Sequence, residues 1–259
     1  RIPVTVSVTA ESPVPEGTPV FFELQREGAT LARAQARLQE LAAGQTVTLR
    51  AEGLSVPPWV PPGRYQIALS SPASELTGAR VEPASLVIGG PTVSPPAASL
   101  EFDHEQATLR WAEAKLPPVI AQVHGADASV AEAAPRIIAI PATTDSHPCG
   151  WVQDASPAEG VLDFTGLDRI AAGLLNHAPE ALLLVQVFLD SPPWWDAANA
   201  DQLVRFHGQI TAPLGMWGRR RTFPDLASGR WAGGARDRLR ALVEHVEASP
   251  YAHRVIGYE

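Results

Sequence analysis

The chain has 259 residues, 45% of them hydrophobic, so it is long enough to bury a substantial core and, on length alone, to form two globular domains. It carries 20 Lys and Arg residues against 28 Asp and Glu residues, a formal net charge of -8, which argues against binding to nucleic acid or to an anionic membrane surface. One cysteine, Cys149, excludes an intrachain disulfide, and no apolar run reaches the roughly 18 residues that a membrane span needs.

The first part of the chain has the alternating polar and apolar pattern of short β-strands. Proline and glycine clusters, such as residues 12–17 and 57–63, separate the alternating runs. Residues 30–45 are also rich in Ala, Leu, Gln and Arg, so a helix is the alternative there. This spacing predicts an all-β, Ig-like sandwich over residues 1–90. The predicted strands cover residues 4–9, 20–25, 30–38, 46–51, 64–70 and, with a weaker pattern, 84–88.

A change of composition follows the predicted sandwich. Residues 89–98 contain several prolines and no periodicity, which indicates a semi-rigid spacer. We therefore place a linker at residues 91–99 and a second domain at residues 100–259. Its opening stretch, up to about Val123, has the pattern of one or two further strands.

The second domain alternates apolar runs with helical patterns, which indicates a parallel α/β sheet. Thr165 is the predicted N-cap of the first helix, and Asp168 falls in its first turn. A complete barrel takes about 250 residues, more than follow the linker, so we expect an incomplete (β/α)8 TIM barrel that continues beyond residue 259. The predicted strands cover residues 137–140, 181–189 and 255–258, and the predicted helices cover residues 166–177, 196–206 and 231–248.

Several short motifs in this second domain have a recognisable order. Leu-Asp-Phe-Thr-Gly-Leu-Asp occupies residues 162–168, Asp-Ser-Pro-Pro-Trp-Trp occupies residues 190–195, and Trp231 opens a long helical pattern. Ser-Pro-Tyr-Ala at residues 249–252 and Val-Ile-Gly-Tyr at residues 255–258 complete the series. Together they resemble the opening of the barrel in clan A glycoside hydrolases of the family-42 β-galactosidase type.

The resemblance covers residues 137–259 and excludes the predicted sandwich. It implies a glycosidase that acts on β-linked glycosides or polysaccharide by a retaining mechanism with two carboxylates and no cofactor. In that family the Val-Ile-Gly-aromatic strand precedes the Asn-Glu pair that carries the acid/base. The resemblance therefore implies that the catalytic residues lie beyond Glu259.

Candidate substrate-binding residues follow the predicted strands of the second domain. Trp194 and Trp195 come after an apolar strand and two prolines, where a flat aromatic face suits a sugar ring, although both can instead pack the strand-to-helix corner. Asp190 ends the same strand and can bond a sugar hydroxyl or cap the next turn. Asp145 follows the first strand of this domain, together with Thr143 and Thr144, and is a further candidate.

Glu259 is the low-ranking candidate for catalysis. It ends the strand that carries the acid/base in the resembled clan, but alignment on the Val-Ile-Gly-aromatic run places it where the family has Gln. A substrate-orienting or structural role is the alternative.

The sequence contains no pattern of metal ligands. The seven histidines are scattered, and His147 and Cys149 lack further ligands nearby, so we expect no metal site and no cofactor. We expect a carbohydrate substrate, no nucleic acid, no membrane span, and a further chain or segment that completes the barrel. A secreted, periplasmic or cell-surface location is favoured over a cytoplasmic one. The alternative functions are a non-catalytic carbohydrate-binding or cell-surface protein with a degenerate barrel, and a barrel enzyme of unrelated chemistry.

Overall fold

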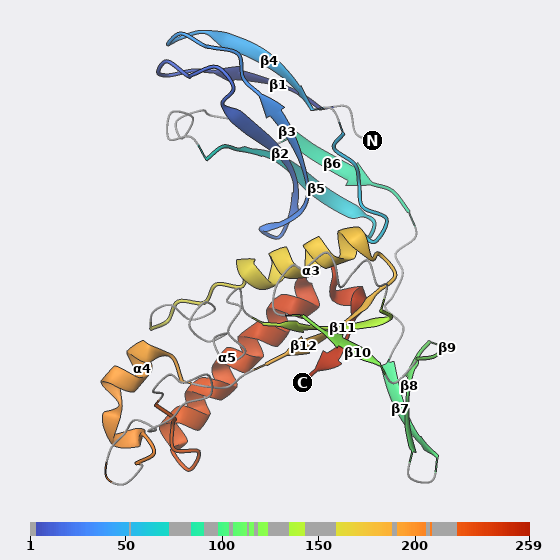
Figure 1. Cartoon of the computed structure of the whole chain (residues 1–259), viewed down its shortest axis with the longest axis vertical. Helices are drawn as coiled ribbons and strands as arrows, with labels where there is room; N and C mark the ends of the chain where they lie inside the picture. The colour runs from blue at the N-terminus through green and yellow to red at the C-terminus, as the bar shows by residue number, and fades with distance from the viewer. Residues whose placement is uncertain are drawn as a thin grey trace.

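The computed structural model describes residues 4–51, 53–72, 84–90, 98–103, 106–112, 114–116, 119–123, 135–142, 159–187, 191–205, 208 and 222–259. These residues form thirteen β-strands, three α-helices and two short 3-10 helices. Antiparallel sheets built from the first part of the chain lie at one end of the long axis, and a parallel sheet with its helices lies towards the other end (Figure 1).

The N-terminal strands form two antiparallel sheets. In one, β1 (Val4–Thr9) pairs with β4 (Thr46–Ala51). The other has the order β3 (Ala29–Arg37), β2 (Pro19–Arg26), β5 (Gly63–Ser70) and β6 (Ala84–Ile88). The predicted strand positions are confirmed, including a strand at the start of the Ala-rich stretch where a helix was the alternative. Alternating apolar residues of these strands face a shared core, because side chains alternate between the two faces of a strand.

A small antiparallel sheet lies beside the parallel sheet, away from the N-terminal sheets (Figure 1). It contains β7 (Ala98–Asp103), β8 (Gln106–Trp111) and β9 (Ala114–Lys115), so this stretch holds more strands than the sequence pattern predicted. Trp111 and Leu116 from this sheet pack with Ile137 and Leu182 in a separate buried cluster. The small sheet thereby covers one face of the parallel sheet at the amino ends of its strands.

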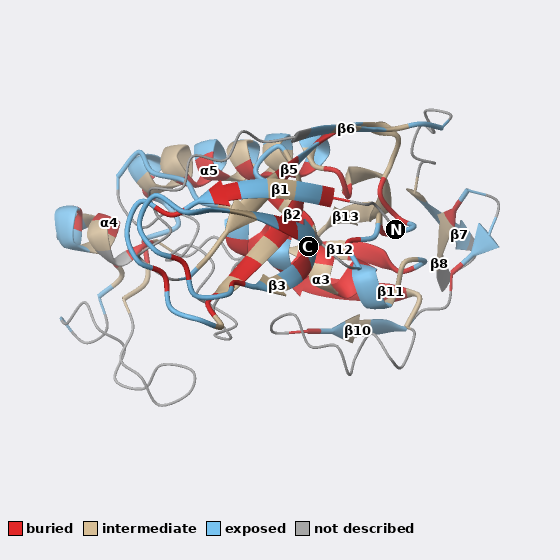
Figure 2. Cartoon of the chain, turned by 90° about the horizontal axis from the view of Figure 1, so that it is seen from above, coloured by how far each residue is buried: buried red, intermediate tan, exposed pale blue. Residues whose placement is uncertain are grey.

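The parallel sheet has the order β10 (Ile120–Gln122), β11 (Ile137–Pro141), β12 (Leu182–Gln186) and β13 (Val255–Tyr258). All neighbouring strands are parallel, which confirms the prediction that the three apolar runs of the second domain pair in this way. Every residue of β11 is buried, whereas the edge strand β10 is largely exposed (Figure 2).

Three α-helices accompany this sheet: α3 (Thr165–His177), α4 (Pro193–Ala198) and α5 (Gly229–Ala248). Helix α3 begins close to its predicted position, but Phe164 rather than Thr165 occupies the N-cap position, and the Asp163 carboxylate accepts hydrogen bonds from the Thr165 amide and hydroxyl. The helix predicted over residues 196–206 is wrong. Helix α4 starts earlier because prolines fit the first turn of a helix. It stops at Ala198, where the Asn199 side chain donates to the carbonyl of Trp195 over 2.8 Å.

The predicted fold class of an incomplete (β/α)8 TIM barrel is wrong. Strands dominate the described part of the chain and only three α-helices accompany them, whereas a barrel of this class needs about eight helices. An apolar strand followed by a helix is common to barrels and to open parallel sheets, so this pattern does not distinguish the two folds. The domain boundaries at residues 1–90, 91–99 and 100–259 stay a prediction.

A continuous hydrophobic core joins the N-terminal sheets to the α/β part. It includes Phe22, Leu24 and Leu31 from the N-terminal strands together with Leu167, Leu174 and Val185. Trp59, only 1% exposed, lies in the same core, and its indole N–H donates to the Asn176 side-chain oxygen over 2.8 Å. The amide of Asn176 in turn donates to the carbonyl of Leu31 over 2.9 Å. Trp59 and Asn176 therefore fix the N-terminal sheets on helix α3.

Within the residues described above, no helix is both long enough and apolar enough to cross a membrane. The longest, α5, carries charged residues along much of its length, as a helix with one solvent-facing side does.

We expect Trp59→Phe to lower the free energy of unfolding by about 1 kcal/mol more than Trp231→Phe, because only Trp59 loses a hydrogen bond. Trp231 is the control, since its indole nitrogen is buried and has no hydrogen-bond partner among the residues that the structure describes. Urea unfolding followed by far-ultraviolet circular dichroism measures both variants. Equal losses of stability would show that the Trp59–Asn176 hydrogen bond contributes nothing.

Candidate functional site

A row of polar side chains lies at the carboxyl ends of the parallel strands. Gln122 ends β10, Gln186 ends β12, and Glu259 directly follows β13. The Gln122 amide donates to the Gln186 side-chain oxygen over 3.1 Å, and the Gln186 amide donates to a Glu259 carboxylate oxygen over 3.3 Å. We call these three residues the carboxyl-edge row. In open parallel sheets, ligands bind in the region outside the carboxyl ends of the strands.

The backbone of Glu259 holds its side chain in this row. Its N–H donates to the carbonyl of Val185 over 2.9 Å, and its carbonyl accepts from the N–H of Val187 over 2.7 Å. Glu259 therefore extends the ladder between β12 and β13 by one residue. The arrangement leaves an amide, a second amide and a carboxylate side by side, a set that can donate to and accept from the hydroxyls of one ligand.

The two candidate tryptophans lie on helix α4 and differ in exposure. Trp195 is 5% exposed, which favours the packing alternative over a ligand contact, and its role as a substrate-binding residue stays a prediction. Trp194 is half-buried and keeps part of its ring accessible. Next to them, the Asp196 carboxylate accepts hydrogen bonds from the hydroxyls of Ser191 and Thr222. Asp196 thus connects the residues just before α4 to the segment that leads towards α5.

Two further candidates, Asp190 and Asp145, lie outside the described residues. The same holds for Thr143 and Thr144 and for the metal-site residues considered in the sequence, His147 and Cys149. Among the residues whose placement is described, no three His, Cys, Asp or Glu side chains come close enough together to hold a metal ion.

A buried carboxylate cluster was missed by the sequence analysis, which assigned Asp168 only to the first turn of a helix. Asp168 is 4% exposed, and one of its oxygens, Oδ1, accepts from the Tyr251 hydroxyl over 2.6 Å and from His245 Nε2 over 2.8 Å. Burial, and then the neighbouring Asp168, raise the pKa of the Tyr251 hydroxyl. The ring of Phe164 lies against the imidazole of His245, with 4.8 Å between the ring centroids. The cluster joins α3 to α5 and to the turn that leads into β13.

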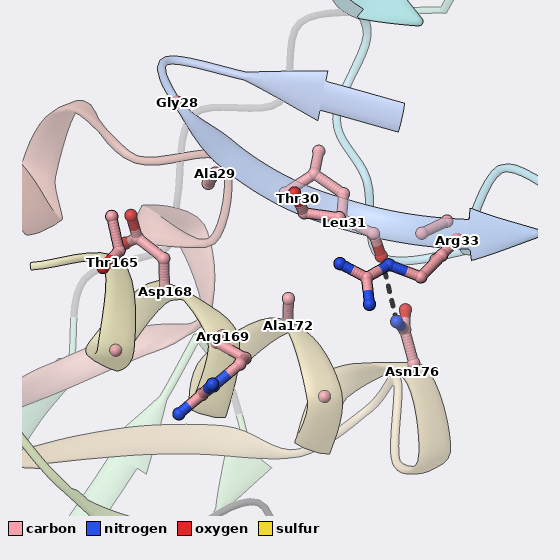
Figure 3. A pocket seen from close by; sticks show the side chains of 13 residues that line it. Gly28, Ala29, Thr30, Leu31, Arg33, Thr165, Asp168, Arg169, Ala172 and Asn176 are labelled. Carbon is pink, nitrogen blue, oxygen red and sulfur yellow. Dashed lines mark hydrogen bonds between the residues drawn. The ribbon is translucent and has the colours of Figure 1, made fainter. Parts of the chain in front are cut away.

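A groove lies between strand β3 and helix α3, and we call it the α3–β3 groove. Its volume is about 510 Å³, and its walls come from residues 28–33 on one side and from one face of α3 on the other. Figure 3 shows Thr165 and Asp168 near the hairpin end of the groove, with Arg33 and Asn176 further along it. The hydrogen bond between Asn176 and Leu31 closes the groove at that far end.

The wall formed by β3 includes an ion pair between the buried Glu23 and the exposed side chain of Arg33. Arg33 donates to the Glu23 carboxylate over 2.5 Å, and Glu23 is 5% exposed. Burial acts to raise the pKa of Glu23, but hydrogen bonds from Ser70 and Arg33 outweigh it and leave the pKa of this carboxyl below its ordinary value. Glu23 thus orients Arg33, whose guanidinium also lies 4.8 Å from the centre of the Phe21 ring.

A second cavity of about 710 Å³ lies where the loop around Trp59 meets the turn after α5. Its walls include Trp59, Trp111, Arg26 and His253. Burial, and then the charge of Arg254, lower the pKa of His253, so its imidazole is held towards the neutral form. Both tryptophans are at least nine-tenths buried, so neither offers an open ring face to a ligand.

We expect Tyr251→Phe to lower the free energy of unfolding by about 2 kcal/mol, because the buried Asp168 loses a charge-assisted hydrogen bond. Tyr258→Phe is the matched control, since its hydroxyl donates to Glu247 over 3.0 Å in an exposed position, and we expect it to lose less than about 1 kcal/mol. Chemical denaturation at neutral pH measures both. A loss in Tyr251→Phe no larger than in Tyr258→Phe would contradict the importance of the cluster.

Glu23 also predicts a pH dependence. Because its pKa is lower in the folded chain than in the unfolded one, its contribution to stability is complete above the ordinary value of 4.5 and is lost as the pH falls through the folded value. The stability difference between the wild type and Glu23→Gln should therefore shrink as urea midpoints are followed from neutral pH to below 4.5. Glu16→Gln, at an exposed glutamate, should show no such trend. A constant difference for Glu23→Gln would contradict the assignment.

Comparisons with known proteins add no assignment to this geometry. No protein-family model matches the chain, and no curated protein matches it. The similarity to clan A glycoside hydrolases therefore rests on the short motifs of the sequence alone.

Proposed function

We propose that this protein binds carbohydrate at the carboxyl-edge row and serves glycoside hydrolysis on β-linked glycosides or polysaccharide, as its resemblance to clan A glycoside hydrolases implies. The observation that carries the proposal is the row itself. Gln122, Gln186 and Glu259 come from three strands and meet in one chain of hydrogen bonds at the edge where parallel sheets bind ligands.

The chemistry of the row suits a polyhydroxylated ligand. A sugar hydroxyl both donates and accepts, so adjacent hydroxyls can bond a carboxylate and an amide at the same time. Glutamine side chains are neutral, and the hydrogen bond from Gln186 keeps one Glu259 oxygen in a fixed position. A neutral ligand is favoured over a strongly charged one, since Glu259 is the one charged member of the row.

Retaining hydrolysis requires catalytic groups that binding alone does not. It needs two carboxylates about 5–5.5 Å apart, one as acid/base and one as nucleophile. Glu259 is the carboxylate that the described strand ends place at this edge, and its position after β13 fits a group that orients or protonates a substrate. The hydrolytic part of the proposal is therefore supported by the resemblance, and the binding part by the geometry.

A second candidate is a non-catalytic carbohydrate-binding protein. It is favoured by the pairing of Glu259 with Gln186, because a carboxylate that is already hydrogen-bonded to an amide is suited to orienting a hydroxyl. The two candidates share the binding site and differ in whether bound glycoside is cleaved.

The test combines binding and turnover in one set of variants. We expect nuclear magnetic resonance titration with β-linked disaccharides to perturb the signals of Gln122, Gln186 and Glu259, and Glu259→Gln to weaken binding about tenfold through loss of a charge-assisted hydrogen bond. Gln186→Ala should weaken it several-fold. Glu244→Gln, at an exposed glutamate of α5, is the control and should bind as the wild type does.

Hydrolysis of aryl β-glycosides by the same samples separates the two candidates. Turnover that falls in Glu259→Gln supports the enzyme, and binding without turnover supports the binding protein. Signals that stay unchanged at the row with every disaccharide would overturn the proposal.

A further inference from the structure

The α3–β3 groove contains a carboxylate that is held on one side and free on the other. Both hydrogen bonds to Asp168 go to Oδ1, from Tyr251 and from His245. In the part of the chain that the structure describes, nothing donates to its second oxygen, Oδ2, and Asp168 is one of the residues that line the groove. Oδ2 is not among the fully buried unpaired atoms of the described residues, so it is open to the groove and can accept a further hydrogen bond.

The opposite wall of the groove supplies donors. Arg33 projects from β3 into the space above α3, as Figure 3 shows, and its charge is offset by Glu23. The Thr165 hydroxyl at the mouth of the groove already donates to Asp163, and small apolar residues, Ala29 and Ala172, line its walls. With Arg169 also in the lining, the groove offers an acceptor at one end and the Arg33 guanidinium as a donor further along.

Strand β3 leaves room for a ligand because it is the edge strand of its sheet. Its register with β2 skips Leu31, a β-bulge that turns the Leu31 carbonyl towards Asn176. The Asn176 contact holds the strand against α3 at one end, while the hairpin end stays apart from the helix. The groove is thus built by packing between two parts of the chain and does not depend on a flexible side chain.

We propose that the α3–β3 groove is a second saccharide-binding site, in which Asp168 Oδ2 accepts from a ligand hydroxyl and Arg33 donates to another. The hydroxyls of a neutral polyhydroxylated ring can bond Asp168 on one wall and Arg33 on the other at the same time. Arg33 is paired with Glu23, and the opposite charges of Asp168 and Arg169 both line the groove, so the groove favours neither an anion nor a cation. The ligand class is that of the proposed function, so the inference rests on it in part, but the site is separate from the carboxyl-edge row.

Two substitutions test the groove without relying on one folding outcome. Asp168→Asn keeps an oxygen for Tyr251 and His245 and replaces Oδ2 with an amide that donates, so we expect saccharide binding at the groove to weaken about tenfold. Thr165→Tyr places a bulky ring at the groove mouth from an exposed position and should block binding there. Thr48→Tyr, at an exposed position of β4, is the matched control and should have no effect.

The readout is a two-dimensional amide resonance titration of the whole chain with lactose, cellobiose and xylobiose, with glycine as a zwitterionic probe and acetate as an anionic one. Thermal unfolding of each variant checks that it folds. Shifts at residues 28–33 and 165–176 that persist in Glu259→Gln and disappear in Thr165→Tyr support the groove as a separate site.

Other outcomes overturn the inference in distinguishable ways. Saccharide shifts confined to the carboxyl-edge row and lost in Glu259→Gln would remove the groove and leave the proposed function intact. Groove shifts with glycine or acetate and none with saccharides would overturn the ligand class. The absence of saccharide shifts at both places would overturn the groove and the proposed function together.

Discussion

The indole of Trp59 is the contact on which the arrangement of the molecule depends. Its ring is buried in the core that the N-terminal sheets share with the α/β part, and its N–H reaches Asn176 on helix α3. The side-chain amide of Asn176 also donates to the Leu31 carbonyl, which links α3 to β3. A flat, rigid side chain loses little entropy when it is fixed, so one tryptophan can set the position of a whole sheet. The position of β3 over α3, and hence the α3–β3 groove, follows from it.

The two faces of the parallel sheet pack against different partners, and this difference explains why the carboxyl-edge row can be polar. One face packs Ile138, Ile140 and Leu183 into the main core, and the other packs Ile137 and Leu182 under the small sheet of β7, β8 and β9. The cluster under the small sheet contains Ile137 and Leu182 at the amino ends of the strands, with Leu184 and Ile256 packed against it, and it does not include Gln186. Side chains of the second face change from apolar to polar along the strands, and Gln186 on β12 shares this face with Leu182. A polar row can therefore lie at the carboxyl edge without leaving unpaired groups in the core.

Buried carboxylates fix the other details of the two candidate sites. Asp168 connects three segments through Tyr251 and His245, and Glu23 connects three neighbouring strands through Arg33 and Ser70. Each would be unfavourable alone in an apolar environment, and each is stabilised by donors that only the native arrangement brings together. Such groups disfavour alternative packings, since a shift of one element leaves a charge without partners. Asp168 also contributes a carboxylate to the lining of the groove.

The sequence by itself determined the strands of the N-terminal part, the parallel pairing of the three apolar runs and the approximate bounds of α3 and α5. Those features depend on local periodicity, which a chain carries in its own order of residues. It also pointed to Glu259 and to the tryptophans after β12, because polar and aromatic residues at strand ends stand out from an apolar run. Only the tertiary structure decided that Trp195 is buried, that Glu259 pairs with Gln186, and that Asp168 meets Tyr251, 83 positions later. The architecture was missed for the same reason, since the number of helices around a sheet and the contacts between distant segments depend on packing, and no pattern within a single segment records it.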